Sequence, residues 1–390
     1  MTKQLKIGII GVGNMGSSHV YNVHELPNTC LTAVCDINQE KLDRIKPEVK
    51  SQIQMYTNSK DFFEQADIDA VIIAVPHYDH VPLAIEALRR GKHIIVEKPI
   101  AVDKQSGMEL LAEAEKYPEL VKAVMLCQRT LPNHAKIKRI IDNGELGTIK
   151  RVNWIVTDWY RTQFYYDSGD WRASWRGEGG GVLINQCPHQ LDMLQWFCGM
   201  PKKIHAFISL GKYHDIEVED EISAIIEFES GASGVFTAST GEAPGTNRLE
   251  IAGTRGKLLY ENGQIKFFRN EVPDDEHCRT AKSGFQKPEV WNVDIPCAMP
   301  NAFNQHRQII SNFADVVLNG GKLLAPLEEG IHSLEIGNAI LFSGLTGETV
   351  TLPLDSKRFK ELLDKLIATS RYRKKDSAAG EDASFGNSFI

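Results

Sequence analysis

The first forty residues carry glycines and a carboxylate at the spacing that a bound dinucleotide requires. An apolar run at residues 7–10 is followed by Gly11-Val12-Gly13-Asn14-Met15-Gly16 and then by a helix-compatible stretch. Glycine at these places allows a tight turn, close approach of the backbone to a pyrophosphate, and close packing of helix on strand. The pyrophosphate would lie on the free amides at the helix start. The cofactor-binding residues predicted here are Gly11, Gly13, Asn14 and Met15.

Asp36 follows the next apolar run, residues 31–35, twenty positions after Gly16. A carboxylate there can accept both ribose hydroxyls of the adenosine half, whereas a 2′-phosphate would meet its negative charge. The expected cofactor is therefore NAD, with NADP disfavoured. A third apolar run, residues 70–75, leads to Pro76, and ligands bind beyond the carboxyl ends of such strands. The residues expected to border the dinucleotide on that side are Val75, Pro76, His77 and His80.

A lysine follows the fourth apolar run, in the segment Glu97-Lys98-Pro99. The proline restricts Lys98 to an extended backbone, which directs the side chain instead of letting it continue into a helix. In a desolvated cleft a lysine can hydrogen-bond a reacting hydroxyl or exchange a proton with it. A solvated lysine at a strand end is the plainer interpretation of this motif alone. We predict that Glu97 and Lys98 lie beside the nicotinamide, that Lys98 is catalytic, and that Gln128 and Arg129 line the same cleft.

A second segment that could do chemistry runs from Gly179-Gly180-Gly181 to Asp192. Asn185, His189 and Asp192 fall at i, i+4 and i+7 of one predicted helix, so they would share a face. Histidine has the intrinsic proton affinity for acid–base work at neutral pH, which makes His189 a candidate catalytic residue. Taken alone, His189 is better explained as a packed helix residue. Asp192 would either orient the imidazole or serve as a plain capping or surface residue.

Aromatic residues are dense between positions 158 and 175. They are Trp159, Tyr160, Phe164, Tyr165, Tyr166, Trp171 and Trp175. Aromatic faces pack on the C–H faces of a pyranose, which favours a cyclic sugar, although packing of the loop and of a subunit contact is the alternative. Arg161, Arg172 and Arg176 are interleaved with them, so a carboxylate or phosphate on the substrate stays open. The predicted substrate-binding residues are Asn185, Arg172, Trp171, Tyr160 and Gln128.

The composition excludes several classes of protein. With 390 residues, 42% hydrophobic and 24% charged, the chain is typical of a globular protein of two domains. A net charge of -7 argues against nucleic-acid binding. The first strand follows the start too closely for a signal peptide, and no apolar run reaches membrane-spanning length, so no membrane partner is expected. Seven cysteines without a C-x-x-C pair indicate reduced thiols in a cytoplasm, and no metal site is predicted.

The arrangement of apolar runs predicts the elements that must position these residues. Up to about residue 125 short apolar runs alternate with helical patterns, which predicts a doubly wound parallel sheet of the Rossmann type. Its expected strands are 6–10, 31–35, 70–75, 93–96 and 123–127. After Pro132 a helix at 133–143 is followed by longer strands rich in branched and aromatic residues. Those strands are expected at 150–157, 203–211, 222–228, 233–239, 248–252 and 257–260.

The second half therefore predicts an α+β domain with an open, predominantly antiparallel sheet covered by helices on one face. Another subunit is expected to cover the bare face, giving a homodimer or homotetramer. Helices are also expected at 303–319 and 330–345. The predicted division is an NAD-binding domain at 1–127, a substrate-binding and oligomerisation domain at 128–354, and a C-terminal helix and polar tail at 355–390. The last part, 378–390, is expected to be mobile unless it docks on a neighbour.

Three segments together make the chain resemble the Gfo/Idh/MocA family, the glucose-fructose oxidoreductase and inositol dehydrogenase group. They are the loop 11–16, the segment 97–99 and the segment 179–192, and the resemblance runs from about residue 3 to 354. It implies a Rossmann domain, an antiparallel sheet domain, and oxidation or reduction of sugars, polyols or glycosides. It also implies that Lys98 and His189 lie near the reacting carbinol.

Asn185 departs from the pattern of many family members, which have an aspartate at this place. Asparagine can position a hydroxyl but cannot take its proton, so that proton must go to His189. The run Asn185-Gln186-Cys187-Pro188-His189 resembles a subgroup with Asn-Gln-x-Pro-His here. The family-level roles of Lys98 and His189 are thus still expected.

The predicted reaction is hydride transfer between NAD and a ring hydroxyl or ketone of a sugar or glycoside. The subgroup resemblance alone suggests C3 of a pyranoside. An inositol or polyol dehydrogenase would use the same residues. A non-catalytic, cofactor-dependent regulator is a rival from another class, against which the presence of Lys98 and His189 weighs. Glycoside hydrolysis through transient oxidation by tightly held NAD is a further alternative.

Overall fold

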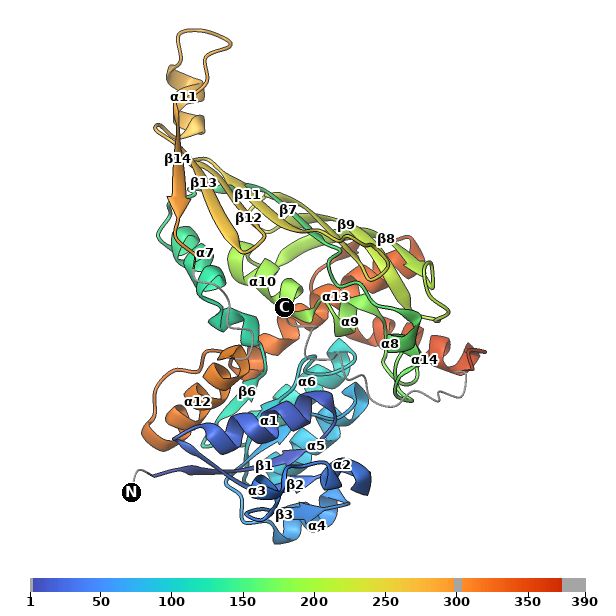
Figure 1. Ribbon diagram of the computed structural model, residues 1–390. Helices are drawn as coiled ribbons and strands as arrows, with labels where there is room; N and C mark the ends of the chain where they lie inside the picture. The colour runs from blue at the N-terminus through green and yellow to red at the C-terminus, as the bar shows by residue number, and fades with distance from the viewer. Residues whose placement is uncertain (1–2, 298–303, 374–390) are drawn as a thin grey trace.

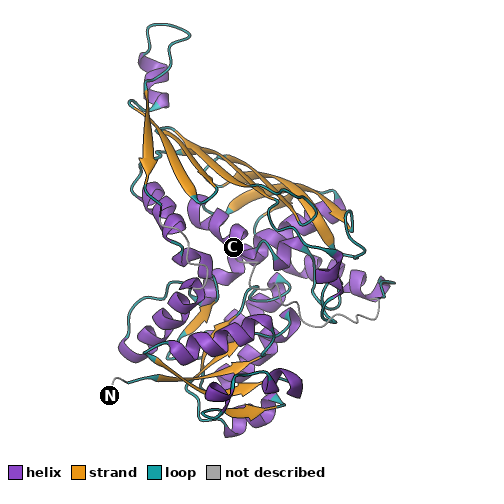
Figure 2. Ribbon diagram, viewed as in Figure 1, coloured by secondary structure: helices purple, strands orange, loops and turns teal. Residues whose placement is uncertain are grey.

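The computed structural model describes residues 3–297 and 304–373, which form two domains, each built on its own sheet (Figures 1 and 2). The two sheets lie at opposite ends of the molecule, with helices between them (Figure 2). The residues expected to do chemistry come from the segments that meet between the two domains.

The amino-terminal domain is a six-stranded parallel sheet in the order β3-β2-β1-β4-β5-β6. Its strands are β1 (Leu5–Ile10), β2 (Thr29–Cys35), β3 (Gln54–Tyr56), β4 (Ala70–Ile73), β5 (His93–Val96) and β6 (Lys122–Val124). Its helices are α1 (Asn14–Glu25), α2 (Gln39–Asp43), α3 (Pro47–Lys50), α4 (Ser59–Gln65), α5 (His80–Arg89) and α6 (Lys104–Ala114), with a 3-10 turn η1 (His77–Asp79). The predicted Rossmann sheet is confirmed, with β3 as an additional strand. The strand order reverses between β1 and β4, where ligands bind in such folds.

The second domain is a nine-stranded sheet in the order β14-β13-β12-β11-β7-β10-β9-β8-β15. Its strands are β7 (Ile149–Val156), β8 (Pro201–Leu210), β9 (Glu219–Phe228), β10 (Ser233–Ser239), β11 (Asn247–Gly253), β12 (Gly256–Glu261), β13 (Gln264–Asn270), β14 (Val290–Ile295) and β15 (Val350–Thr351). Neighbouring strands are antiparallel except β10 and β7, which are parallel. The predicted open, predominantly antiparallel sheet is confirmed, while β13, β14 and β15 were not predicted.

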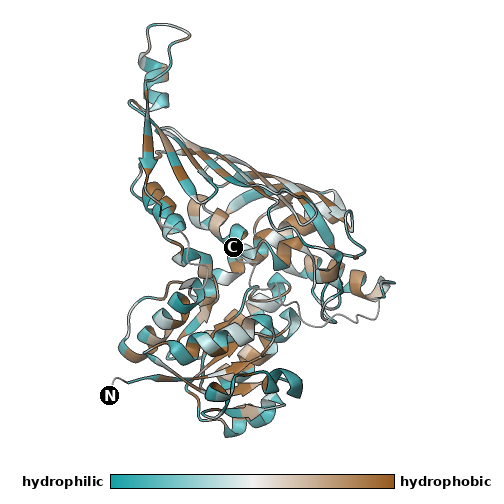
Figure 3. Ribbon diagram, in the orientation of Figure 1, coloured by the Kyte–Doolittle hydropathy of each residue, from teal (hydrophilic) through white to brown (hydrophobic). Residues whose placement is uncertain are grey.

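Helices cover one face of this sheet. They include α7 (Pro132–Asp142), α8 (Gln163–Asp167), α9 (Val182–Asn185), α10 (Pro188–Cys198), α13 (Gly330–Thr346) and α14 (Ser356–Thr369), while α11 (Asp274–Thr280) stands out beyond β13 and β14 (Figure 1). Side chains alternate along β9, where Ile222, Ala224 and Ile226 are buried and Ile225 is exposed on the other face. Helix α13 has several brown segments in Figure 3, and its buried Ile336, Ile340 and Leu341 belong to the core of the second domain.

One helix returns the chain to the amino-terminal domain. Helix α12 (Asn304–Asn319) packs beside α1, and Ile309, Ile310 and Phe313 belong to the core of the first domain. A buried ion pair also joins the domains, because Lys104 Nζ of α6 donates to Glu335 Oε1 of α13 at 2.6 Å. The predicted boundary at residue 127 did not anticipate this return of the chain.

The prediction of one helix carrying Asn185, His189 and Asp192 is wrong. Helix α9 ends at Asn185, and α10 begins with Pro188 at its first position. Proline lacks the N–H that a continuous helix would need at this position. Asn185 and His189 therefore lie on two short helices separated by a turn.

Helix α14 lies where a C-terminal helix was expected, whereas the predicted polar tail at 378–390 lies outside the described residues. Within 3–297 and 304–373, no helix is both long enough and apolar enough to cross a membrane.

Candidate active site

The glycine loop between β1 and α1 has the backbone that a pyrophosphate site needs. Gly11 has a φ of +89°, and a Cβ there would lie 2.3 Å from the carbonyl oxygen of Ala74. A Cβ on Gly16 would lie 1.8 Å from the carbonyl oxygen of Gly11, so helix and loop pack too closely for any side chain. A Cβ on Gly13, in contrast, would face open space, with Lys41 Nζ as its nearest neighbour at 3.9 Å.

Helix α1 presents its free amides at this opening. Gly13 is its N-cap residue, no side chain caps the helix start, and no acidic residue stands in the first turn. An anion is stabilised by free amides and by the positive end of a helix dipole. The loop therefore fits the pyrophosphate of a dinucleotide, while the cofactor contacts of Gly11, Gly13, Asn14 and Met15 stay predictions.

Asp36 lies at the end of β2 with its carboxylate held toward the loop. Its Oδ2 accepts from the N–H of Val12 at 2.8 Å, and its Oδ1 accepts from the N–H of Asn38 at 2.9 Å. Lys41 Nζ lies 3.9 Å from Asp36 Oδ2. Asp36 thus fixes the glycine loop as well as offering acceptors for ribose hydroxyls. The lysine nearby is a feature that the sequence pattern did not predict.

Lys98 joins the two domains at the candidate site. Its Nζ donates to the carbonyl oxygen of Asn185 at 2.7 Å, at the end of α9. Burial lowers the pKa of Lys98, and the neighbouring carboxylate of Glu97 partly opposes this shift. The lysine can therefore release its proton more readily than an exposed lysine would.

Glu97 anchors the segment that carries Lys98. Its Oε2 accepts from the N–H of Lys98 at 3.0 Å, and its Oε1 lies 2.7 Å from His19 Nε2. Burial alone would raise the pKa of Glu97, but the hydrogen bond and charge of His19 outweigh it and lower the pKa to about 2. Glu97 is therefore ionised at neutral pH. His19, on α1, was not predicted as a site residue.

His189 is buried close to Lys98. Its Nε2 lies 3.9 Å from Cys127 Sγ, which is itself 3.3 Å from His306 Nε2. Burial, followed by the positive charge of Lys98, lowers the pKa of His189 to about 3. Within the described chain its Nδ1 has no hydrogen-bond partner. The imidazole is therefore neutral at neutral pH, and its Nδ1 is a buried ring nitrogen without a hydrogen-bond partner.

Asp192 does not orient His189. Its two carboxylate oxygens accept from Arg129 Nε at 2.8 Å and from Arg129 Nη2 at 2.6 Å, and its Oδ1 also accepts from Gln195. Arg129 is buried as well and contacts Glu329. The suggestion that Asp192 orients the imidazole is wrong, because its carboxylate is committed to a buried bidentate ion pair. The prediction that Arg129 lines the cleft is corrected for the same reason.

Asn185 contributes its backbone to Lys98 and its side chain to Glu178, whose Oε1 accepts from Asn185 Nδ2. Glu178 also accepts from the N–H of Ala173 at 2.8 Å through Oε2. The segment 158–175, which carries the dense aromatic residues, is called the aromatic loop below. Through these two hydrogen bonds the buried Glu178 connects the aromatic loop to α9. It precedes the three glycines directly, and that position is the only sequence signal that could have pointed to it.

The aromatic loop reaches the same site. Arg172 Nη1 donates to Tyr165 Oη at 2.6 Å, and Gln186 Nε2 donates to the same oxygen at 3.0 Å. The ring of Trp171 lies 5.0 Å from the ring of His77. Arg172 therefore lies near Gln186, the neighbour of Asn185, and the substrate contacts of Arg172 and Trp171 stay predictions. Tyr160 is 49% exposed, and its position as a substrate contact stays a prediction.

Some residues after β4 are hydrogen-bonded within the protein, and others are accessible to a cofactor. His80 lies with Nδ1 2.7 Å from the carbonyl oxygen of Pro99 and Nε2 2.9 Å from that of Val75. Its ring therefore clamps the ends of β4 and β5 together instead of facing a ligand. His77 Nδ1 lies 3.0 Å from the carbonyl oxygen of Glu178. Pro76 is exposed and Val75 half-buried, so both remain available to the cofactor.

Gln128 lies in the 3-10 turn η2 (Cys127–Thr130) that follows β6. Its carbonyl oxygen lies 3.1 Å from His134 Nδ1, and its side chain is half-buried. Its substrate contact stays a prediction.

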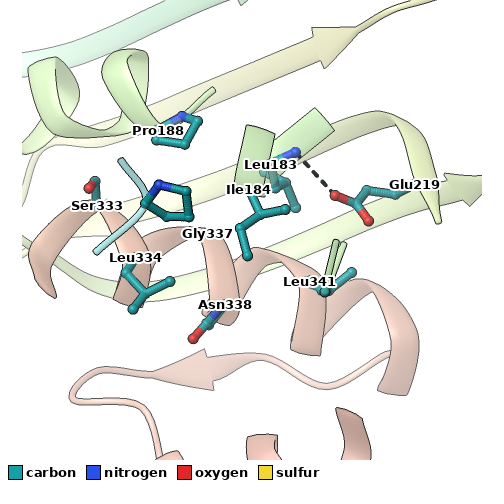
Figure 4. A pocket seen from close by; sticks show the side chains of 11 residues that line it. Leu183, Ile184, Pro188, Glu219, Ser333, Leu334, Gly337, Asn338 and Leu341 are labelled. Carbon is teal, nitrogen blue, oxygen red and sulfur yellow. Dashed lines mark hydrogen bonds between the residues drawn. The ribbon is translucent and has the colours of Figure 1, made fainter. Parts of the chain in front are cut away.

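A small cavity behind α9 is not the reaction site. Figure 4 shows it between α9, the start of α10 and α13, with Leu183, Ile184, Leu334 and Leu341 among its lining residues. Lys98 and His189 do not line it. Glu219 points to its edge and accepts from the N–H groups of Gly181 and Leu183, while burial raises its pKa to about 7. Through these hydrogen bonds the Glu219 carboxyl group fixes the backbone that follows the three glycines.

Comparison with known families agrees with this geometry. A family model described as "Oxidoreductase family, NAD-binding Rossmann fold" matches residues 5–124, and one described as "GFO/IDH/MocA C-terminal domain" matches residues 134–259. The chain belongs to the Gfo/Idh/MocA oxidoreductase family. The predicted resemblance, the NAD-binding domain and the oxidoreductase class are confirmed.

Individual relatives extend the likeness over most of the chain. The oxidoreductase YrbE of Bacillus subtilis is 31% identical over 271 residues, which are 68% of this chain and 76% of the relative. The scyllo-inositol 2-dehydrogenase (NAD(+)) of the same organism is 29% identical over 371 residues, 92% of this chain and 98% of the relative. The crystal structure of the WlbA dehydrogenase from Chromobacterium violaceum, in complex with NADH and UDP-GlcNAcA, matches with a TM-score of 0.77 and 26% identity, covering 91% and 98% of the two chains.

Proposed function

We propose that the protein is an NAD-dependent dehydrogenase or reductase acting on a ring hydroxyl or ketone of a sugar or glycoside. The observation that carries this proposal is the meeting of Lys98 from the first domain with His189 and Asn185 from the second. An amine and a neutral imidazole beside a dinucleotide site are the groups needed to handle the proton of an alcohol during its oxidation.

His189 and Lys98 have complementary roles in the proposed reaction. His189, held neutral by burial, accepts the hydroxyl proton, and Lys98 donates a hydrogen bond to the oxygen as negative charge develops there. Bound NAD supplies the hydride acceptor. Asn185 anchors Lys98 through its carbonyl oxygen, and Glu97 fixes the backbone before Pro99. Because these groups lie where the two domains meet, they would orient the substrate and exclude water from it.

A cyclic substrate is supported by the aromatic loop and by the relatives. Trp171 and Tyr165 lie beside Arg172 at the site, where a pyranose ring could pack on them. The matched WlbA dehydrogenase carries a nucleotide sugar in its crystal structure, which favours a sugar. The inositol dehydrogenase relative keeps a polyol as the second candidate. Oxidation at C3 rests on the subgroup resemblance alone.

A homo-oligomer formed through the open sheet is part of the proposal. The face away from the helices exposes Phe207 at 68% and Ile225 at 60%, and Val235 lies directly opposite Ile225 in the strand register. A second copy of the chain would cover this apolar surface. Changing Ile225 to Asp should shift the mass measured by light scattering toward the monomer. Seven cysteines without a disulfide agree with a reducing cytoplasm.

The test is a screen for NADH formation with the full chain, NAD and a panel of sugars, glycosides and inositols. Activity on a pyranose or glycoside, lost in Lys98→Met, supports the proposal. Activity confined to inositols would mean that the protein is a polyol dehydrogenase instead. Tight NADH binding with no turnover of any panel member would favour a regulatory protein. Cleavage of a glycoside without free NADH would favour the hydrolytic route.

A further inference from the structure

We propose that Arg161 and Arg172 form a subsite for an anionic group on the substrate, a carboxylate or a phosphate. This inference rests on the proposed function and narrows its substrate class to acidic sugars. The two guanidinium groups lie on the aromatic loop beside the candidate active site.

Arg172 is held in place by aromatic groups rather than by an acid. Its guanidinium carbon lies 4.3 Å from the centre of the Tyr165 ring and 4.4 Å from that of Trp171. The hydrogen bond to Tyr165 Oη further fixes its orientation. Stacking orders a guanidinium while leaving its edge free, and the edge is what pairs with a carboxylate or phosphate.

Arg161 lies against the same tyrosine. Its guanidinium carbon is 5.1 Å from the centre of the Tyr165 ring and 5.3 Å from that of Trp159. Its Nη1 donates to the carbonyl oxygen of Tyr160, while its buried Nε has no hydrogen-bond partner within the described residues. A buried N–H without a partner is costly, and a ligand oxygen would satisfy it.

No carboxylate in the described ranges forms an ion pair with either arginine within 4.0 Å. Asp158, whose charge interacts with that of Arg161, directs its Oδ2 to Asn247 Nδ2 at 3.1 Å. Two cations therefore lie around Tyr165 with no ion-paired carboxylate in the described ranges, and Asp158 acts on Arg161 only at longer range. A negatively charged ligand would pair with them directly.

Arg172 also lies near the reaction site. The positive charge of Arg172 contributes to lowering the pKa of both Lys98 and His77, so the three groups share one environment. Tyr165 Oη, bonded to Arg172, also accepts from Gln186, the neighbour of Asn185. In the proposed complex the substrate's hydroxyl lies at Lys98 and His189, and its acidic group lies at the arginines.

The first experiment compares binding to the NADH-loaded full chain by calorimetry, using glucuronate, glucose 6-phosphate and glucose as probes. Charge-assisted hydrogen bonds predict that at least one acidic probe binds on the order of tenfold to a hundredfold more tightly than glucose. The glucuronate and phosphate arms show which anion the subsite takes. Equal binding of the acidic and neutral probes, including no binding of any, overturns the inference.

The second experiment tests whether Arg161 and Arg172 cause the tighter binding of the acidic probes. Arg161→Gln and Arg172→Gln should each remove most of it, whereas Arg279→Gln, which removes the same charge from the distant exposed helix α11, should leave it intact. Retention of the preference in both loop variants would overturn the subsite. Because a loop variant could fail to fold, wild-type binding is also measured against salt, and the acidic probe's advantage should shrink as salt rises.

These outcomes are independent of the proposed reaction. A protein that never forms NADH with any sugar or polyol would refute dehydrogenase activity, yet calorimetry would still show whether the arginines prefer an anion. Conversely, turnover of neutral sugars with no preference for acidic ones would retain the dehydrogenase and remove the subsite.

Discussion

Lys98 Nζ donates to the carbonyl oxygen of Asn185 across the junction of the two domains, at 2.7 Å. The lysine follows β5 of the Rossmann sheet, and the carbonyl belongs to the last residue of α9. This contact brings the reactive groups of the second domain to the carboxyl ends of the first domain's strands, where a dinucleotide binds. The candidate site therefore exists only because both domains fold and dock.

The pH dependence of kcat/KM should show a wide plateau. His189, with a pKa of about 3, stays neutral across pH 5 to 7, so the acid limb of an ordinary histidine should be missing. Lys98 has a lowered pKa, so its ammonium form is lost on the alkaline side at a pH below 10.5. Initial rates of NADH formation from pH 5 to 10 test both points. An acid limb near 6.5 that vanishes in His189→Asn would contradict the assigned protonation state.

Removing the charge of Asp36 should weaken NAD binding. Asp36→Asn keeps an acceptor for the N–H of Val12 but loses the ionised acceptors for the ribose hydroxyls. The loss of charge-assisted bonds predicts a fall in NAD affinity on the order of tenfold or more and a smaller gap between NAD and NADP. Fluorescence titration with NADH and NADPH measures both. An unchanged preference for NADH would show that Asp36 only shapes the loop, and Asp43→Asn, on exposed α2, is the matched control.

The buried pair of Arg129 and Asp192 should be strongly coupled. Arg129→Met leaves the Asp192 carboxylate buried without its cation, which is expected to lower the free energy of unfolding by about 3–5 kcal/mol. The double variant Arg129→Met/Asp192→Leu removes both charges and should recover much of that loss. Urea denaturation of the two variants and the wild type provides the measurement. Additive losses in the double variant would mean that the two side chains stabilise the fold independently.

Local patterns predicted the backbone geometry of the glycine loop and of the segments beside it. Gly11, Gly13 and Asp36 act through backbone geometry and charge within one βαβ unit, so their spacing along the chain is enough to place them. Lys98 was placed for the same reason, because a strand end and a following proline determine its direction. The doubly wound sheet followed from the alternation of apolar runs with helical patterns.

The contacts between distant segments could not be predicted from local sequence patterns. Asp192 pairs with Arg129, 63 positions away, and the local sequence around either residue does not predict the other as its partner. His19 and Cys127 likewise reach Glu97 and His189 only after folding. The break between α9 and α10 did carry a local signal, because Pro188 lies between Asn185 and His189.

The most direct test of the proposed chemistry is a stopped-flow measurement of NADH formation by Lys98→Met and His189→Asn, using the substrate found in the screen at saturating NAD. Loss of a general acid or base predicts that the rate falls by roughly 10²–10⁴-fold. NADH affinity should stay near the wild-type value in His189→Asn, and His24→Asn, an exposed histidine on α1, should keep the wild-type rate. Rates within a few-fold of wild type in both site variants would contradict the assignment of the reaction to these two residues.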